Sequence, residues 1–481
     1  MNYKMVLNVL GKVFLLEIIL LALPMIVGFI YNESSYMAWL IPMASLFVLG
    51  APLSLIRVKN KAIYAKEGFV IVSLAWILMS AFGAVPFVIN GALPSYADAF
   101  FETVSGFTTT GSTVIVNVET IDRSIQFWRA LTHWIGGMGV LVFVLAITPG
   151  YNSGAMHVLR AESPGPTVGK LVSKLSFTAR ILYGIYMAMT VLLIILLLIG
   201  KMPVFDSIVH AFATAGTGGF GVKADSIGGY GTYNQAVIAI FMFLFSINFN
   251  LYYLILIGNV KKAFKSEEFR AFTIIVVVST LSIALNIMAQ VGNFGMALHH
   301  AFFQVSSISS TTGFSSTDFA NEWPDFSKAI LMVLMVIGAC AGSTGGGIKV
   351  SRLVILCKSV TADIKRMLHP RSVVVVKFEN EPLSKETERN VRSYFVVYIL
   401  IVALCSLVLC LDINDFMTNF SSTLACLGNV GPGITKLNGP MANFALYSPY
   451  SKVLLSIVML VGRLEIFPIL ILFTPRTWKK V

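Results

Sequence analysis

Residues 107–113 form a polar segment, FTTTGST, in a chain that is 56% hydrophobic and only 12% charged. Three β-branched threonines followed by a glycine are poor helix formers. They do offer many carbonyl and hydroxyl oxygens. Glycine permits positive φ, which lets the carbonyls of successive residues turn toward one line. Rings of such carbonyls can replace the water shell of a monovalent cation. FTTTGST therefore predicts the coordination of a dehydrated cation.

Segments of this kind occur four times, and each is a short amphipathic run of small residues closed by a glycine: FETVSGFTTTG (101–111), VHAFATAGTGG (209–219), FQVSSISSTTG (303–313) and SSTLACLGNVG (421–431). The closing glycines are separated by 108, 94 and 118 residues. Each run is too short to cross a bilayer, so it must enter and leave on the same side. Non-helical backbone survives at that depth only inside protein or beside a water-filled cavity. The alternative is that the glycines only allow close helix packing, but four near-equal spacings favour loops around one pore.

Ten apolar windows predict the spans that position these loops: 12–31, 37–56, 68–90, 127–148, 181–200, 235–258, 271–291, 327–358, 393–411 and 450–474. The first is expected to be a retained helix, since no small-x-small cleavage site follows it. The predicted fold is an all-α polytopic membrane protein with four pseudo-symmetric repeats of helix, pore helix and helix around a central pore. The predicted units are an N-terminal helix pair (1–66) and pore repeats at 67–165, 166–265, 266–375 (with a broken second helix) and 376–481.

The basic residues predict the orientation. The N-terminus, the C-terminus and four intervening segments (57–66, 160–180, 261–270 and 349–392) hold 27 of the 35 Lys and Arg residues, so these segments and both termini are expected in the cytoplasm. The opposite side carries twelve acids and seven bases, which should attract cations to an outer mouth. The net charge of +12 is thus a signal of topology, and no nucleic-acid partner is expected.

The eighth span contains a glycine-rich break in which helical backbone is energetically unfavourable. It is formed by Gly342, Ser343, Thr344, Gly345, Gly346 and Gly347. We expect this loop to obstruct the pore below the carbonyl ring; a packing kink is the alternative.

Arg463 lies inside the last span, where an arginine costs about 2.5–3.5 kcal/mol. Glu465, two positions away, would lie on a different helix face. Arg463 is therefore predicted to face the pore, as a positive barrier or as a hydrogen-bond donor to the carbonyls of the loop.

These segments, with HWIGGMG (133–139), AGSTGGGIK (341–349) and GRLEIFP (462–468), resemble the Trk/Ktr/HKT superfamily of potassium transporters, and within it the TrkH type. The resemblance covers residues 68–481. It implies a pseudo-fourfold pore in one chain, a homodimer in the bacterial inner membrane, and a cytoplasmic ring of TrkA-type nucleotide-binding regulatory subunits. It implies a potassium filter lined by Thr109, Thr110, Gly111, Gly218, Gly219, Thr311, Thr312, Gly313, Asn429, Val430 and Gly431. The second and fourth copies, TGGF and NVGP, depart from the threonine-rich form, so unequal sides are expected.

Other readings of the sequence are weaker. GTGGFG (216–221) matches a dinucleotide-binding pattern but follows a helix, and GSTGGGIK (342–349) lacks the spacing of a phosphate-binding loop. No enzymatic activity and no resident cofactor are expected; potassium is the transported ion. The histidines and cysteines lack metal-ligand spacing and are expected to be surface or packing residues. Potassium symport with protons or sodium stays open, because Asp98 and Glu102 could titrate. The polar segment 359–392 suits docking of a regulator.

Overall fold

The computed structural model describes residues 1–58, 64–139, 175–413 and 415–478. Helices dominate these ranges, and their only strands form one short antiparallel hairpin, β1 (Lys377–Phe378) with β2 (Glu381–Pro382). The predicted all-α class is confirmed. No strand precedes GTGGFG in these ranges, so the context that a dinucleotide fingerprint requires is missing there.

The helices follow the predicted order. The N-terminal pair is α1 (Tyr3–Ile30) and α2 (Met37–Ser54). The first repeat contains α3 (Ala65–Asn90), α4 (Tyr96–Phe107), the 3₁₀ turn η1 (Val118–Thr120) and α5 (Arg123–Met138). The second contains α8 (Leu175–Ile199), α9 (Val204–Gly216), α10 (Thr232–Phe245), α11 (Phe249–Leu256) and α12 (Val260–Phe264). The third contains α13 (Glu267–Val291), α14 (Phe294–Ser309), α15 (Phe319–Glu322), α16 (Asp325–Ile337) and α17 (Val350–Leu368). The fourth contains α18 (Lys385–Leu409), α19 (Phe416–Leu427), η2 (Phe444–Leu446), α20 (Pro449–Arg463), α21 (Phe467–Leu472) and α22 (Pro475–Trp478).

Six single helices in the described ranges are long and apolar enough to cross a membrane, namely α1, α2, α3, α8, α13 and α18. They correspond to six of the ten predicted spans. Local sequence sets several of their ends. Ser384 caps α18 by accepting from the Thr387 amide, and Gly91 and Gly292 end α3 and α13 in the left-handed conformation, as is common at helix C-termini. The first span begins at Tyr3, well before the predicted residue 12.

The second helix of every repeat is short, which was predicted only for the third. α5 ends at Met138, α10 at Phe245, α16 at Ile337 and α20 at Arg463. The predicted span 235–258 bends by 91° between α10 and α11, and the span 450–474 breaks between α20 and α21, where Glu465 and Ile466 adopt positive φ. The remainder of the predicted span 127–148, from residue 140, lies outside the described residues. Continuous helices were therefore the wrong prediction for 235–258 and 450–474.

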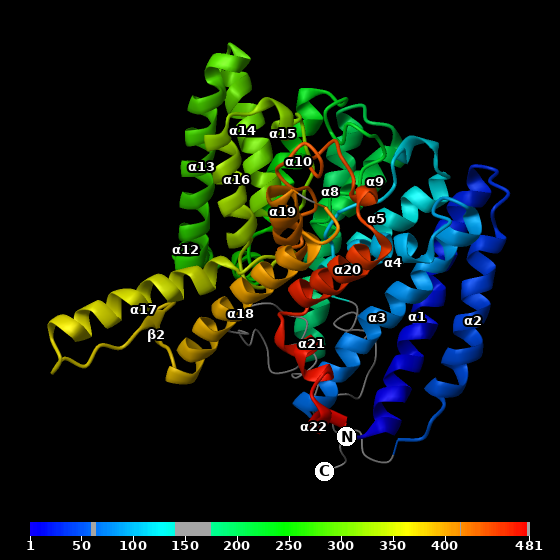
Figure 1. The fold of residues 1–481 in the computed structure, drawn as a ribbon, viewed down its shortest axis with the longest axis horizontal. Coiled ribbons are helices and arrows are strands. Elements are labelled where there is room, and N and C mark those ends of the chain that lie inside the picture. The colour runs from blue at the N-terminus through cyan, green and yellow to red at the C-terminus, as the bar shows by residue number, and fades with distance from the viewer. Residues whose placement is uncertain (59–63, 140–174, 414, 479–481) are drawn as a thin grey trace.

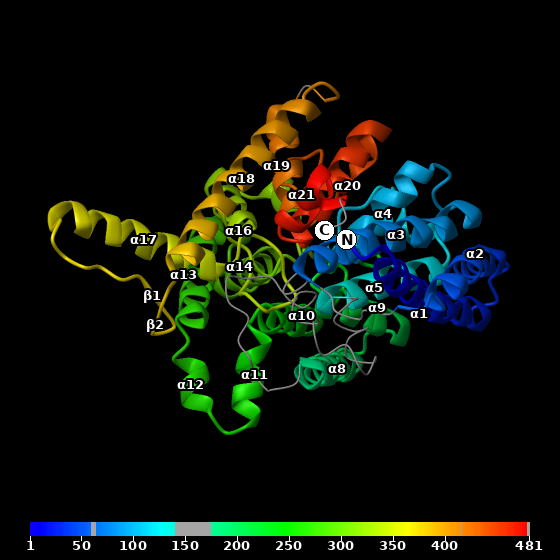
Figure 2. The ribbon, with the colours of Figure 1, turned by 90° about the horizontal axis from the view of Figure 1, so that it is seen from below.

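The repeats surround a common centre. Figure 1 shows α1 and α2 at one edge of the molecule and α13 at the opposite edge. Seen from below in Figure 2, the first, second, third and fourth repeats follow one another around the middle. The Tyr3 hydroxyl donates to the Trp478 carbonyl, so the first and last described helices meet at one end of the bundle. α17 and the hairpin project sideways from the body in both views.

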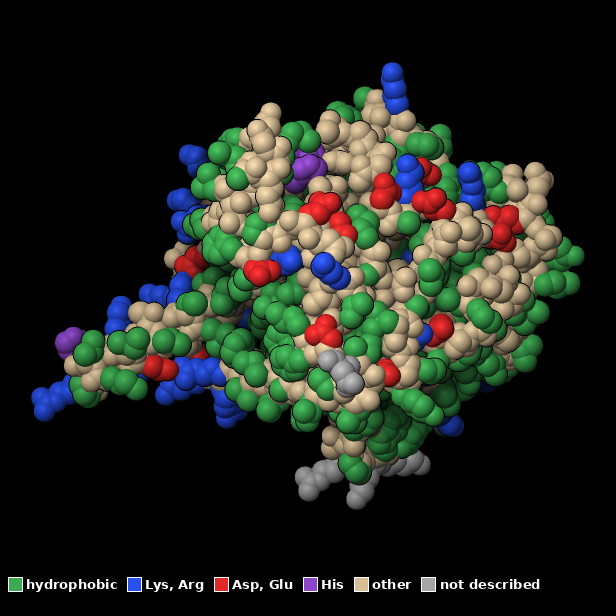
Figure 3. All heavy atoms as spheres, turned by 45° about the horizontal axis from the view of Figure 1, so that its top comes forward, with side chains coloured by type: hydrophobic (Ala, Val, Ile, Leu, Met, Phe, Trp, Pro, Cys, Tyr) green, Lys and Arg blue, Asp and Glu red, His purple; other side chains and the backbone are tan. Residues whose placement is uncertain are grey.

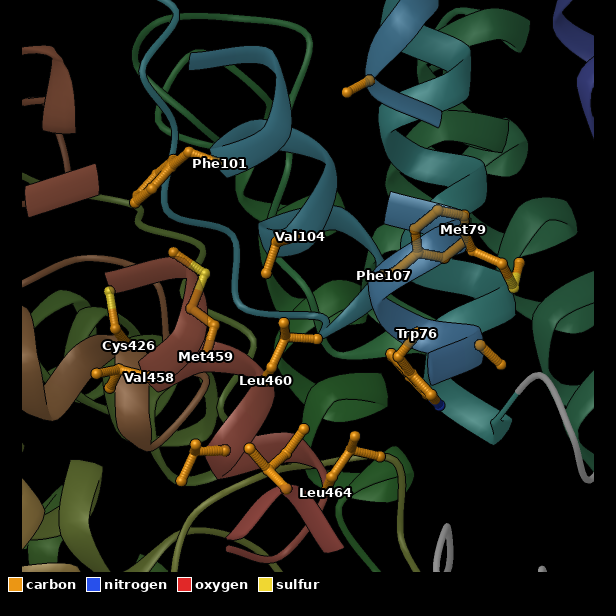
Figure 4. Packing of buried hydrophobic residues seen from close by; sticks show 14 of the residues in the cluster. Trp76, Met79, Phe101, Val104, Phe107, Cys426, Val458, Met459, Leu460 and Leu464 are labelled. Carbon is orange, nitrogen blue, oxygen red and sulfur yellow. The ribbon is translucent and has the colours of Figure 1, made fainter. Parts of the chain in front are cut away.

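The largest apolar core joins the first and fourth repeats. Phe101, Val104 and Phe107 of α4 are buried. Figure 4 shows Phe107 beside Met79 and Trp76 of α3, and Val104 next to Leu460 of α20. The ring of Phe101 also contacts that of Phe444, with centroids 5.7 Å apart. This packing fixes the first pore helix against the last repeat and so brings sequence-distant loops together.

Candidate functional site: four glycine-closed segments in a ring

Each pore helix, α4, α9, α14 and α19, leads directly into one of the four glycine-closed segments. In every segment the closing glycine and the residue two positions before it have positive φ: Thr109 and Gly111 (54° and 84°), Thr217 and Gly219 (55° and 83°), Thr311 and Gly313 (61° and 83°), Asn429 and Gly431 (54° and 103°). Positive φ is uncommon for threonine. Four copies therefore share one unusual backbone conformation, with left-handed residues alternating with ordinary ones.

The four segments close on one another in cyclic order. A Cβ added to any of the closing glycines would lie closer than 3.0 Å to a carbonyl oxygen of the next segment: Gly111 to Gly218, Gly219 to Thr312, Gly313 to Val430, and Gly431 to Thr110. Side chains are excluded at these contacts, so glycine is required there. The segments predicted from their spacing are thus brought together around a single axis.

A cavity of about 100 Å³ opens from this ring and is lined by all four closing glycines, with Ser112 and Lys223 among its other residues. One water molecule needs roughly 10–15 Å³ by this kind of measure. The ring therefore opens into a mouth with room for several water molecules, lined by residues that follow the closing glycines in the sequence. The C-terminal ends of the pore helices carry partial negative charge, and they approach the ring from all four repeats.

The side chains behind the ring differ between repeats, as the departures TGGF and NVGP predicted. In the first and third segments a hydroxyl pair links two residues: Thr108 with Thr110, and Ser310 with Thr312, both at 2.7 Å. The fourth instead uses Asn429, whose Nδ2 donates to Thr110 Oγ1 at 2.9 Å and to the Met459 carbonyl at 3.0 Å.

At the left-handed positions of the ring, two buried side-chain oxygens have no hydrogen-bond partner among the described residues, Thr109 Oγ1 and Asn429 Oδ1. Thr217 occupies the same position in the second segment but is missing from the predicted set. Counting back two residues from Gly219, as from Gly111, would have found it.

The glycine-rich break is longer than the predicted 342–347. Helix α16 ends at Ile337, α17 begins at Val350, and nearly all residues between them are buried. Gly338, which has a φ of 70°, begins the break, so residues 342–347 form only half of a break that runs from 338 to 349. The amide of Gly346 donates to Thr311 Oγ1 at 2.6 Å. A Cβ on Gly345 or Gly346 would lie closer than 3.0 Å to the Ser310 or the Gly428 carbonyl, respectively. The break therefore lies directly against the third and fourth segments of the ring.

Arg463 lies at the end of α20 and connects this loop to the first repeat. Its guanidinium donates to the Thr344 carbonyl at 2.8 Å, and to the Gly136 and Gly137 carbonyls at 2.7 and 2.9 Å. The contact with Thr344 is of the hydrogen-bonding kind predicted for Arg463. Glu465 pairs instead with Arg352 of α17.

Further charged residues anchor the loop, and the sequence interpretation did not identify them. The Glu268 carboxylate accepts from the Ala341 and Ser351 amides at 2.7 and 3.0 Å. Lys349 is buried with a φ of 80°, and its ammonium donates to the Gly345 carbonyl. A signal was present in the sequence, because Glu268 and Lys349 are charges placed at the edges of apolar runs, where burial requires a partner.

The two acids considered as titrating groups are both paired. Glu102 is fully buried and accepts from Arg129 Nε at 2.8 Å and from the Val114 amide at 2.9 Å. Asp98 pairs with Lys452 at 2.7 Å. In the exposed turn after α18, burial acts to raise the pKa of Asp412, but hydrogen bonds from Ser448 and Ser451 and the charge of Lys452 together outweigh it and lower that pKa. Asp412 thus stays ionised near neutral pH.

Known proteins resemble the chain along its whole length. A family model described as "TrkH: Cation transport protein" matches residues 37–480. The "Trk system potassium uptake protein TrkH" of Salmonella typhimurium is 35% identical over 491 residues and covers 100% of both chains. The "Trk system potassium uptake protein TrkG" of Escherichia coli is 33% identical over 95% of this chain and 94% of its own. The crystal structure of the potassium transporter TrkH from Vibrio parahaemolyticus superposes with a TM-score of 0.90 at 31% identity and covers 100% of each chain.

Proposed function

The chain belongs to the TrkH family of cation transport proteins, and we propose that it conducts potassium ions through the ring of four glycine-closed segments. The observation that carries this proposal is the cyclic contact of each closing glycine with a carbonyl of the next segment. Peptide oxygens held so closely around one axis can replace the hydration shell of a monovalent cation. The potassium-binding atoms are the carbonyls of the predicted filter residues and of Thr217.

A glycine substitution with a matched control tests the ring. Gly313 has a φ of 83° and no room for a side chain, whereas Gly292 has a similar φ of 73° with nothing within 4 Å of an added Cβ. In liposomes containing the purified chain, we expect potassium permeability to exceed sodium permeability. Gly313→Ser should lower that ratio roughly tenfold, because its Cβ would overlap the Val430 carbonyl oxygen, and a change of about 1.4 kcal/mol at one coordinating carbonyl corresponds to a factor of ten. Gly292→Ser should leave the ratio unchanged. Equal ratios in both variants would refute the assignment.

The loop 338–349 gates the ring in this proposal. It lies against the segments of the third and fourth repeats and is held by Arg463. Movement of the loop away from the ring would open the path. Helix α17 continues directly from the loop and projects from the body (Figure 1). Hydrophobic side chains lie on the surface of this projection (Figure 3), and Val360, Ile364 and Met367 are among its exposed apolar residues. A cytoplasmic TrkA-type nucleotide-binding subunit that docks on α17 and segment 359–392 could therefore displace the loop.

The same proposal places the chain in a bacterial inner membrane, as a homodimer with both termini in the cytoplasm. Three observations support this placement: the membership of the TrkH family, the distribution of Lys and Arg along the sequence, and the contact between α1 and α22 at one end of the bundle. We propose no enzymatic activity for this chain.

Potassium symport with protons or sodium is the alternative. The pairing of Asp98 with Lys452 and of Glu102 with Arg129 leaves neither carboxylate without a cationic partner, so no contact in the described residues favours it. Potassium flux measured at fixed membrane potential, with and without a proton gradient and then a sodium gradient, distinguishes the two. Flux that follows either gradient would replace the channel proposal with symport.

A further inference from the structure

The second segment of the ring lacks the side-chain support that the other three possess. The residue before the closing glycine is Thr110 or Thr312 where a hydroxyl pair forms, and Val430 in the fourth segment, but it is Gly218 in the second. Gly218 is not among the residues with positive φ. Backbone conformation therefore does not explain why this position has no side chain.

The imidazole of His133 occupies the space that a side chain at position 218 would fill. A Cβ on Gly218 would lie closer than 3.0 Å to three atoms of this ring, Cγ, Nδ1 and Cδ2. His133 comes from α5 of the first repeat and is fully buried. Its ring packs against that of Phe220 with a centroid separation of 4.2 Å. The first repeat thus supplies to the second segment the side chain that this segment lacks.

The two nitrogens of His133 join the first and second segments. Nδ1 lies 2.8 Å from the Gly106 carbonyl, and Nε2 lies 3.3 Å from the Phe220 amide nitrogen. A carbonyl can only accept and an amide can only donate, so this pattern selects the neutral ring with its proton on Nδ1. The Gly106 carbonyl also accepts from the Thr109 amide. The His133 side chain therefore connects Gly106, near the end of pore helix α4, to Phe220, which follows the closing glycine of the second segment.

We propose that His133 is a positioning residue for ion selectivity, which holds the carbonyls of Thr217 and Gly218 at the ring and keeps the first and second segments in register. This inference rests on the proposed function of the ring. His133 does not touch the ion. It acts through the backbone of residues 216–220, in the way that the hydroxyl pairs act in the first and third segments.

Three substitutions test the proposal. His133→Leu keeps an apolar body and removes both hydrogen bonds, so we expect the potassium-to-sodium permeability ratio to fall by about fivefold or more, as the loss of one or two neutral hydrogen bonds would give. His133→Gln keeps a donor and an acceptor and should retain most of the ratio. His299→Leu is the matched control, and it should leave the ratio unchanged. That imidazole lies on α14 outside the four glycine-closed segments, and its Nε2 bonds to Gln235 Oε1 at 2.8 Å.

The measured quantity is the reversal potential in mixed potassium and sodium solutions, which reports the ratio independently of how much protein folds and inserts. Equal ratios in the wild type, His133→Leu and His133→Gln would overturn the role of His133 while leaving the ring intact. A wild-type chain without preference for potassium would instead overturn the proposed function itself.

A double substitution covers the case in which His133→Leu does not fold. Gly218→Ala alone should reduce selectivity strongly, because its Cβ would overlap the imidazole. Adding His133→Ala removes the imidazole and makes room for that methyl group, so the double variant should recover part of the permeability ratio. Simple addition of the two single effects would contradict the steric complementarity of Gly218 and His133.

Discussion

Replacement of Arg463 by alanine should increase the potassium flux of the isolated chain. The guanidinium connects the Thr344 carbonyl of loop 338–349, the proposed gate, to the Gly136 and Gly137 carbonyls at the end of α5. If the loop moves and α5 does not, only the bond to Thr344 distinguishes the closed state from the open one. The alanine variant therefore loses one charge-assisted hydrogen bond from the closed state.

The size of the increase follows from that bond. A hydrogen bond to a charged group contributes about 1.5–3 kcal/mol, and each 1.4 kcal/mol corresponds to roughly a factor of ten in an equilibrium constant. The open fraction should therefore rise by about 10- to 150-fold wherever the wild type is mostly closed. Arg463→Lys keeps the charge but not the planar fork that serves three carbonyls, so its flux should be intermediate.

Liposomes containing the purified chain without its regulator provide the assay, with rubidium or potassium uptake normalised to inserted protein. A variant with residues 342–347 shortened provides the comparison. If only the variant with the shortened loop shows raised flux, the loop is still supported as the gate, but Arg463 does not hold it closed. Wild-type flux from both variants would refute the gating hypothesis altogether.

Two further predictions concern stability. Glu102→Gln leaves Arg129 buried without its carboxylate and should cost about 3–5 kcal/mol, seen as a lower temperature of thermal unfolding in detergent. Asp363→Asn, whose carboxylate is 35% exposed beside the partly exposed Arg366 and Arg392, should cost under about 1 kcal/mol. Similar losses in the two variants would show that the Glu102 pair is not desolvated. Glu17 is fully buried in α1, and both carboxylate oxygens lack a partner among the described residues, so Glu17→Leu should stabilise the chain by about 1–3 kcal/mol. A lower unfolding temperature in that variant would indicate that the carboxyl has an essential partner.

The features that the sequence predicted well are those written in local patterns. The four closing glycines and the six uninterrupted spans depend on apolar runs and on the spacing of small residues, which are visible without tertiary contacts. The positive φ at Gly111, Gly219, Gly313 and Gly431 follows from the same pattern. The closure of the four segments into one ring is not visible in local patterns. It was inferred only from the rule that non-helical backbone inside a membrane must be buried in protein or line a water-filled cavity.

The bend between α10 and α11 shows why other features were missed. Residues 235–258 form an apolar run with no proline and with no glycine before residue 258. The local signal is weak: Asn248 caps α11 by accepting from the Asn250 amide. The break is stabilised from far away: the Phe249 amide donates to the Gly342 carbonyl at 3.0 Å, and the Cys340 amide donates to the Ser246 carbonyl at 3.1 Å. Partners about 90 residues distant satisfy the backbone groups that a continuous helix would have satisfied itself.

Ring closure also explains how four unequal segments can serve one ion path. In the proposed filter the coordinating atoms are backbone carbonyls, so side chains would matter only through how they hold the backbone. A hydroxyl pair, an imidazole from another repeat and an asparagine amide can each hold it. Because each closing glycine packs on a carbonyl of the next segment, a displaced segment cannot relax alone. A displacement of Gly218 should therefore also move Gly111, which packs against the Gly218 carbonyl. We expect selectivity to be lost from all four segments together.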